Sequence, residues 1–311
     1  MEKEEENFES KFEKIYAGIC KNCDEKLKEN RTKLNKVLLI VFGILICINI
    51  IIYVYTKSKE ITVLLITISI CIIFFMIIKS REIYKKSYKS CVISSLVKLY
   101  NPKLYFDDKS GISKYDYTMS NFDNNFDEFF SEDKIYGSLE NGTKIRIAEI
   151  VTNIISKSKS GDTTYEDKTQ TYRGMYGVIK LPYNITSSIY IFNDSIMERY
   201  SKDRIEIDSA EFEKYYDCIS EEKVRTLRIL TSEVIEKFND IRRYSKNEFE
   251  LKIENEMIYF RFKCGQIFEP PILGNGLDKE LIKKYYSEIY FPIELIQKLS
   301  ESIENFMEQE E

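Results

Sequence analysis

The strongest hydrophobic pattern in the chain is a pair of uninterrupted apolar runs. Val37–Tyr55 has 19 residues and Ile61–Ile78 has 18, and neither contains a charged residue. At about 1.5 Å per residue each helix would span about 27–28 Å, close to the hydrocarbon core of a bilayer. The runs therefore predict two transmembrane helices. Buried core helices are the alternative. A cleaved signal peptide fits less well, because the first run starts late and a second follows at once.

The five residues 56–60 that join the runs permit only a turn between antiparallel helices, so both ends of this hairpin lie on one side. That side is rich in basic residues, which are Lys21, Lys26, Lys28, Arg31, Lys33 and Lys36 before the hairpin and Lys79, Arg81, Lys85, Lys86 and Lys89 after it. The turn has only Lys57 and Lys59. The positive-inside rule predicts a multi-pass protein of the cytoplasmic membrane with both termini in the cytoplasm.

The N-terminal segment, residues 1–36, has apolar residues at spacings of three and four, which predicts an amphipathic helix. The stripe consists of Phe8, Phe12, Ile15, Tyr16, Ile19, Cys23 and Leu27. This helix could pack on the cytoplasmic domain, pair with another copy or lie on the membrane. Its balanced charges and acidic start make the membrane surface the weakest of the three.

Residues 79–311 are numerous enough to form a cytoplasmic domain with its own core. Apolar spacing predicts helices at residues 79–99, 121–130, 209–216, 221–244 and 278–306, the last interrupted near Pro292. Apolar alternation and turn signals predict strands at residues 134–140, 143–154, 174–181, 187–192, 249–253 and 257–262. The prediction is an α+β fold, an antiparallel sheet with flanking helices.

Two turns and a loop organise these strands. Asn141-Gly142 is a strong signal for a hairpin, and residues 254–256 predict a second one. The polar stretch 156–170 predicts a mobile loop. Pro182 lies between the strands at 174–181 and 187–192 and predicts a junction there.

Composition excludes several kinds of chemistry. The chain has no His, which removes histidine-based catalysis and His-ligated metal sites. A pI near 5.3 argues against nucleic-acid binding. Cys20 and Cys23 form a lone C-x-x-C that we interpret as incidental, and we expect Cys91 to be a reduced cytosolic thiol. We expect no cofactor and no metal.

Two places carry candidate chemistry, and each also has a simpler interpretation. Glu149 lies in a predicted strand and could be a partly buried base, although solvent exposure or pairing with Arg146 or Lys144 is commoner. Phe268-Glu269-Pro270-Pro271 follows a strand and could form an exposed ledge that docks a peptide. Its prolines could also simply terminate the strand. Both places are candidate interaction sites, and no catalytic residue is assigned.

Several segments together resemble the family of unknown function called DUF3137. They are the N-terminal helix and hairpin, FDEFFSEDKIYGSLENGTKIRIAEI (126–150), YRGMYGVIKLP (172–182), SAEFEKYYDCISEEKVRTLRILTSEVIEKFNDIRR (209–243) and IFEPPI (267–272). The resemblance implies an uncharacterised bacterial membrane-anchored protein with a cytoplasmic α+β domain. It also implies a LemA-like membrane protein as a partner, and it supplies no catalytic residues.

Two hypotheses follow from the sequence. The first is a non-enzymatic module, anchored in the lipid bilayer, that binds a small ligand, another membrane protein or a second copy of itself. The alternative is a membrane-tethered enzyme that uses carboxylates on lipid-linked or envelope substrates. It requires two acidic groups that converge in a pocket with raised pKa values.

Overall fold

The computed structural model describes residues 2–160, 163–193, 202–245, 248–271 and 276–310. The chain divides into two compact units. One comprises residues 1–95 and 269–278, and the other comprises residues 96–268 and 279–311. The first is built on long apolar helices and the second on an antiparallel sheet with helices, so the predicted α+β class is confirmed.

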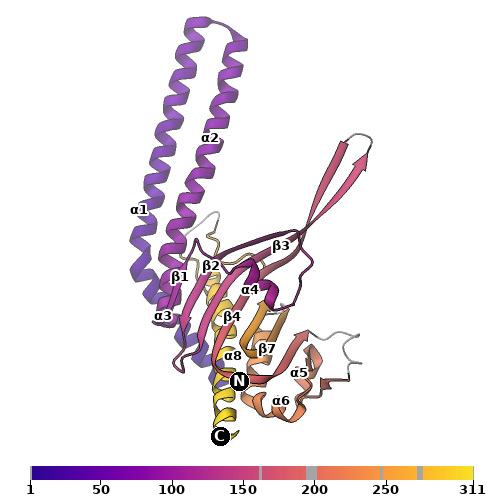
Figure 1. Ribbon diagram of the computed structural model, residues 1–311. Helices are drawn as coiled ribbons and strands as arrows, with labels where there is room; N and C mark the ends of the chain where they lie inside the picture. Colours follow the sequence, from indigo (N-terminus) through magenta and orange to yellow (C-terminus); the bar gives the residue numbers. More distant parts are fainter. Residues whose placement is uncertain (1, 161–162, 194–201, 246–247, 272–275, 311) are drawn as a thin grey trace. The chain divides into compact units, whose positions relative to one another are not determined.

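The first unit contains a helical hairpin (Figure 1). Helix α1 (Glu2–Thr56) and helix α2 (Lys59–Tyr88) run antiparallel, and the π-helical turn η1 (Lys89–Ile93) follows α2. Lys57 takes a left-handed φ of 50° at the turn, and the Ser58 hydroxyl caps α2 by accepting a hydrogen bond from Ile61 N at 3.5 Å. The predicted N-terminal helix and the first apolar run are one continuous helix, α1.

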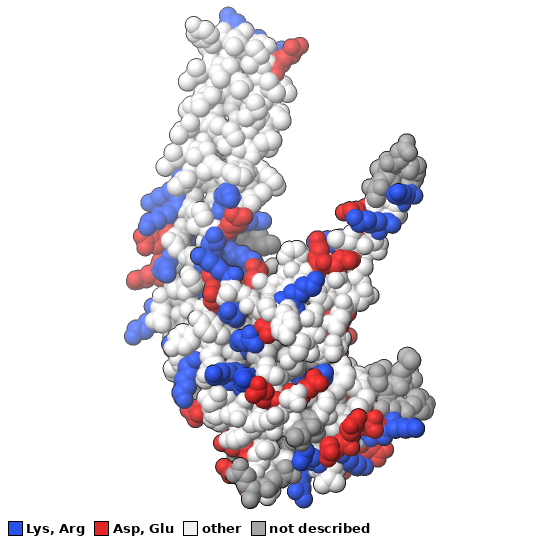
Figure 2. Space-filling model, in the orientation of Figure 1, with Lys and Arg blue, Asp and Glu red and all other residues white. Residues whose placement is uncertain are grey.

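The surface of the hairpin changes character along its length. In the most apolar 18-residue window of each helix no residue is buried, and both helices are long and apolar enough to cross a membrane. Figure 2 shows this part without charge between charged side chains at its tip and base. Nearer the start of α1 the predicted stripe is buried, which applies to Phe8, Phe12, Ile15, Ile19, Cys23 and Leu27. The amphipathic helix is therefore confirmed.

A polar contact joins the two apolar helices within their runs. The side-chain amide of Asn49 in α1 donates to the Ser69 hydroxyl of α2 at 2.8 Å and to the Leu45 carbonyl at 2.7 Å. Thr67, by contrast, donates to Val63 O of its own helix at 3.0 Å. The contact between Asn49 and Ser69 fixes the rotation of one helix against the other, as polar side chains do in membrane helix pairs.

The cysteines of the first unit depart from expectation. Cys23 of α1 forms a disulfide with Cys91 of η1, with Cα atoms 5.8 Å apart. The interpretation of Cys23 as incidental is therefore wrong, because Cys23 lies next to Cys91 and can bond to it. Nothing in the sequence signalled this pair, because the two residues are 68 positions apart and meet only when the hairpin closes.

Within the described residues of the second unit, seven strands form one sheet in the order β1-β2-β3-β4-β6-β5, with β7 also paired to β4. They are β1 (Leu104–Asp107), β2 (Glu128–Ser138), β3 (Lys144–Ser160), β4 (Thr163–Asn193), β5 (Arg204–Ile205), β6 (Tyr216–Ile219) and β7 (Phe249–Phe262). All pairs are antiparallel. The hairpin at Asn141-Gly142 is confirmed, since Leu139 N donates to Thr143 O at 2.8 Å.

Strand β7 doubles back on itself. If it were straight, Glu250 and Arg261 would lie more than about 30 Å apart, at about 3.3 Å per residue. Instead the Arg261 guanidinium donates to both Glu250 oxygens, at 2.7 and 3.0 Å. Lys263 N also donates to Glu248 O at 2.9 Å. The strand reverses at Asn255, whose φ is 56°, so the predicted second hairpin is confirmed.

The two arms of β7 pair with different parts of β4. Residues 175–180 of β4 pair with 257–262, and residues 185–191 pair with 251–255. The register shifts between Lys180 and Ile185, and the ladder to β3 ends at the Lys180–Lys144 pair. Pro182 therefore lies outside both ladders, where its missing N–H removes no ladder bond. Because the two arms run in opposite directions and both pair antiparallel with β4, β4 also turns back between Lys180 and Ile185, which confirms the predicted junction at Pro182.

Helices accompany the sheet, and they correct several predictions. Those not yet given are α3 (Ser94–Tyr100), α4 (Lys114–Met119), α5 (Ala210–Tyr215), α6 (Lys223–Ile229), α7 (Ser232–Tyr244) and α8 (Lys279–Glu310). The predicted helix at 221–244 is broken where the Thr231 hydroxyl caps α7 by accepting from Val234 N at 3.5 Å. Helix α8 continues through Pro292 without the predicted interruption.

Two further predictions are wrong for identifiable reasons. Residues 121–130 are not helical, because Asn121 takes a left-handed φ of 56° after α4 and β2 starts at Glu128. Phe122, Phe126 and Phe129 still pack against the core, as expected of the stripe. The predicted loop at 156–170 extends β3 and β4 as a two-stranded ribbon, with residues 161–162 outside the described part. Pairing between strands depends on residues that are far apart in the sequence, so the composition of one segment does not reveal it.

The contact between Asn49 and Ser69 can be tested by a double-mutant cycle. We expect Asn49→Ala and Ser69→Ala to couple by about 0.6 kcal/mol, the average for such contacts in membrane helices. The measurement is SDS-induced unfolding of the full-length protein in mixed micelles. Thr67→Val is the matched control and should show no coupling to Asn49→Ala. Equal coupling for both pairs would exclude the hydrogen bond between the helices.

Candidate functional site

Glu149 is buried in the sheet, and both of its carboxylate oxygens accept hydrogen bonds. Its Oε1 accepts from Arg173 Nε at 2.9 Å and its Oε2 accepts from Ile267 N at 3.3 Å. Burial raises the pKa of Glu149, and the Arg173 charge opposes that rise. The expected pairing with Arg146 is wrong, because Arg146 pairs with Asp116 at 2.9 Å. With a donor on each oxygen, Glu149 anchors the chain at Ile267 to strand β3.

The motif that begins at Phe268 splits between core and surface. Phe268 is fully buried, with ring centroids 5.8 Å from Phe106 and 5.7 Å from Tyr285. The expected exposed aromatic ledge is therefore wrong at Phe268, whose φ of 57° turns the chain away from the strand. Within the first unit, Glu269 forms ion pairs with Lys85 of α2 and Lys89 of η1. Ile272 lies outside the described residues.

The two prolines of that motif line a groove in the first unit. Pro270 and Pro271 line a cavity of about 510 Å³ together with residues of α1 and α2. Its polar wall includes Arg31 and Arg81. Burial raises the pKa of Tyr84, another lining residue, and the charge of nearby Arg31 opposes the rise. The groove thus joins basic and apolar groups at the end of the apolar runs.

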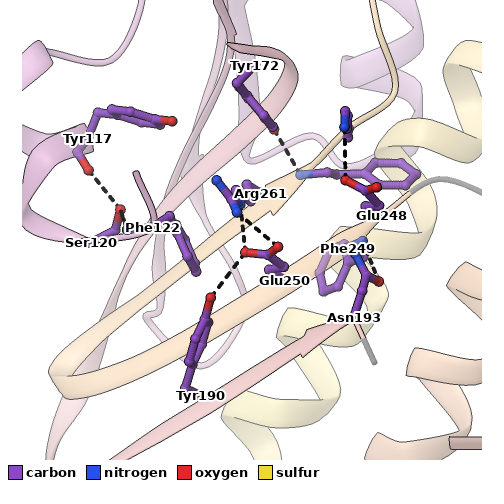
Figure 3. Close-up of polar contacts among 12 residues, drawn as sticks. Tyr117, Ser120, Phe122, Tyr172, Tyr190, Asn193, Glu248, Phe249, Glu250 and Arg261 are labelled. Carbon is purple, nitrogen blue, oxygen red and sulfur yellow. Dashed lines mark hydrogen bonds and ion pairs between the residues drawn. The ribbon is translucent and has the colours of Figure 1, made fainter. Parts of the chain in front are cut away.

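A polar network of the second unit surrounds Arg261 on β7 (Figure 3). Besides its paired bonds to Glu250, the guanidinium lies 5.3 Å from the Phe122 ring centroid and 5.9 Å from that of Tyr172. The Tyr190 hydroxyl donates to Glu250 at 3.3 Å. Burial opposes the charge on Arg261, but Glu250 outweighs it and the pKa of Arg261 is raised.

The role of this network is to fix the β7 hairpin. The adjoining cavity has only about 70 Å³, which suits a few water molecules and no larger ligand. Removing one partner of a buried ion pair leaves an uncompensated charge, so Arg261 and Glu250 are strongly interdependent. Tyr172 extends the network, because its hydroxyl donates to Met175 O at 2.7 Å and accepts from Phe262 N at 3.1 Å.

Glu288 of α8 is a buried carboxylate that the sequence analysis did not single out. Burial raises its pKa to about 7, and Lys284 opposes this from 3.6 Å. Glu288 lines a cavity of about 230 Å³ whose walls include the stacked rings of Tyr244 and Phe291, with centroids 4.4 Å apart. Its Oε2 is buried without a hydrogen-bond partner among the described residues. The residual charge of Glu149 also raises the pKa of Glu288.

One sequence signal could have revealed Glu288. It follows Tyr285 by three positions and precedes Leu295 by seven, so it falls on the apolar stripe of α8. A carboxylate on such a stripe is buried when the helix packs, and burial in turn raises its pKa. The pattern near Pro292 suggested an interrupted helix and concealed this periodicity.

The raised pKa of Glu288 predicts a pH dependence of stability. The folded state retains a proton that the unfolded chain releases above the ordinary pKa of 4.5. Its contribution is therefore most favourable below pH 4.5 and is lost as pH rises to about 7, by about 3 kcal/mol in all. We expect Glu288→Gln to lose less stability than the natural chain between pH 5 and 8.

Chemical denaturation of the full-length protein in detergent, followed by near-UV circular dichroism, measures this difference. The chain has no His, so histidine titration does not obscure the pH window. Glu280→Gln, at an exposed position of the same helix, is the matched control and should keep the natural pH dependence. An unchanged dependence in Glu288→Gln would contradict the assignment.

Comparison with known proteins gives a family and a distant structural neighbour. The family model described as "Protein of unknown function (DUF3137)" matches residues 170–301, which include β7, Arg261 and Glu288. The crystal structure of the mycobacterial trehalose monomycolate transport factor A, TtfA, is similar at 7% identity with a TM-score of 0.33. That alignment covers 67% of this chain and 94% of that chain. A likeness of that size supports no argument about this protein. No curated protein matches the chain. The C-terminal part of the chain, residues 170–301, belongs to the DUF3137 family.

Proposed function

We propose that this protein is a membrane-anchored interaction module without catalytic activity of its own. Helices α1 and α2 fix it in the bilayer, and the sheet unit binds a protein or a small ligand at the cytoplasmic face. The uncovered apolar surface of the hairpin carries the proposal. Exposed side chains there include Leu39 at 69% and Phe74 at 66%, and exposing so many apolar side chains to water is costly.

The distribution of charge supports a cytoplasmic location for both ends of the helical hairpin. Basic residues cluster on α1 just before its apolar run and on α2 just after its own, whereas the turn has Lys57 and Lys59. Juxtamembrane Lys and Arg residues favour the cytoplasmic side. Lys79 and Arg81 directly follow the apolar run of α2. This is the arrangement expected if the termini are cytoplasmic.

The disulfide between Cys23 and Cys91 sharpens this proposal. Cytosolic thiols are normally kept reduced, whereas disulfides persist in oxidising compartments. Cytoplasmic termini therefore predict that both residues are thiols in growing cells and form the disulfide only on oxidation. A disulfide that is complete in living cells would favour the opposite orientation.

The catalytic alternative has one observation in its favour, which is that the charge of Glu149 contributes to the raised pKa of Glu288. Two other observations weaken it. Both oxygens of Glu149 accept hydrogen bonds from Arg173 and Ile267 N, which gives this carboxylate a structural role. The cavity beside Glu288, at about 230 Å³, is also smaller than the roughly 300–1,000 Å³ usual for ligand pockets. The interaction module is therefore the better-supported function.

Membrane anchoring and its orientation can be measured together. We expect the full-length protein to stay in the membrane pellet after alkaline carbonate extraction. We also expect a fluorescent protein fused to the C-terminus to fluoresce and an alkaline phosphatase fused to the C-terminus to be inactive. Rapid acid quenching and alkylation should find Cys23 and Cys91 reduced, with the double Cys→Ser variant as the blank. Carbonate release, or an active phosphatase fusion, would contradict the proposal.

The interaction role can be tested by chemical cross-linking of the tagged full-length protein in its native membranes. We expect one protein, another chain or a second copy, to be recovered in a fixed ratio to the bait. A tagged, unrelated two-span protein at the same level is the control. Recovery of no protein beyond that control would contradict the protein-binding form of the proposal.

A further inference from the structure

We propose that the groove at the base of the hairpin is a binding site for an anionic phospholipid. This inference rests on the proposed membrane anchoring and adds a specific ligand class to it. The groove belongs wholly to the first unit and has a volume of about 510 Å³, within the range of ligand pockets.

The polar wall of the groove suits a phosphate group. Arg31 comes from α1, and Arg81 and Lys85 come from α2, so cations approach from both helices. Arg guanidinium groups recognise phosphate oxygens through paired hydrogen bonds. The amide of Asn35 and the hydroxyl of Ser80 add neutral donors on the same lining.

Acidic residues on the lining do not cancel this character. Glu82 pairs with Lys79 at 3.2 Å, and Glu269 pairs with Lys85 and also with Lys89, at 3.3 Å from the latter. Each of the two carboxylates is therefore already balanced by a lysine. The lining as a whole has three cationic residues, Arg31, Arg81 and Lys85, and two carboxylates.

The apolar wall suits the acyl end of the same molecule. Leu38 of α1 and Ile77 and Ile78 of α2 line the groove and belong to the charge-free runs. The groove thus passes from cations to apolar side chains at the point where the runs end. A phospholipid has the same sequence of groups, from phosphate to acyl chain, as it crosses the membrane interface.

This polarity identifies the occupant as a lipid in preference to a soluble phosphate. A free phosphate would contact the cations and leave Leu38, Ile77 and Ile78 uncovered. Basic pockets between helices at the cytoplasmic interface are a known means of anionic headgroup recognition. Pro270 and Pro271 complete the wall, which gives the motif from the sequence analysis a role in shaping the groove.

The test uses the full-length protein in nanodiscs and counts lipids retained after transfer to detergent, by native mass spectrometry. Discs of phosphatidylglycerol mixed with phosphatidylcholine provide the choice. We expect selective retention of phosphatidylglycerol, reduced about fivefold by Arg81→Gln, from about 1 kcal/mol per basic residue. Arg81 is exposed, so this variant should fold. Lys86→Gln, an exposed neighbour outside the groove, is the matched control.

Each outcome distinguishes the possibilities. Retention that falls in Arg81→Gln and in Arg31→Gln but not in Lys86→Gln supports the site. Equal loss in all three variants would show general surface electrostatics and overturn it. Binding of glycerol phosphate to the delipidated protein as tightly as phosphatidylglycerol would show that the apolar wall contributes nothing, and would overturn the assignment to a lipid. Equal retention of both lipids by a carbonate-resistant protein would overturn this inference while leaving the membrane anchor intact.

Discussion

The pairing of β4 is the constraint on which the second unit depends. This strand pairs with β3 through residues 163–180, with β6 through residues 190–193, and with both arms of β7 along residues 175–191. It therefore connects strands β1 to β3 with β5, β6 and β7. The shift near Pro182 lets two differently placed arms of β7 share one partner strand. Partly buried ion pairs then fix this arrangement, with Glu250–Arg261 across the β7 hairpin and Glu149–Arg173 between β3 and β4.

In the first unit the decisive constraint is solvation. The apolar runs of α1 and α2 have an interhelical hydrogen bond at Asn49 but little packing of their own, since no residue in their most apolar windows is buried. Lipid is the environment in which such a surface is stable. Towards the start of α1 the same unit has polar residues and a buried apolar stripe. There the Cys23–Cys91 disulfide joins α1 to η1.

The buried carboxylates show how similar groups acquire different roles. Glu149 and Glu288 are both buried, and burial raises the pKa of each. Glu149 has a cation and a backbone donor, so it stabilises a chain connection. Among the described residues, Glu288 has one ion pair, with Lys284 at 3.6 Å, and an oxygen without a hydrogen-bond partner beside a cavity, so it retains a proton near neutral pH. The difference lies in the donors that the fold brings to each group.

Features that depend on local pattern could be predicted from the amino-acid sequence. The apolar runs, the stripe from Phe8 to Leu27, the turn at Asn141-Gly142 and the reversal near Asn255 follow from spacing and turn chemistry over a few residues. Tertiary structure alone decided the features that need partners far along the chain. These are the Cys23–Cys91 disulfide, the ribbon that replaces the expected loop at 156–170, the burial of Phe268 and the choice of Arg173 as the partner of Glu149. Each depends on free energy gained only after distant segments meet, which no local pattern encodes.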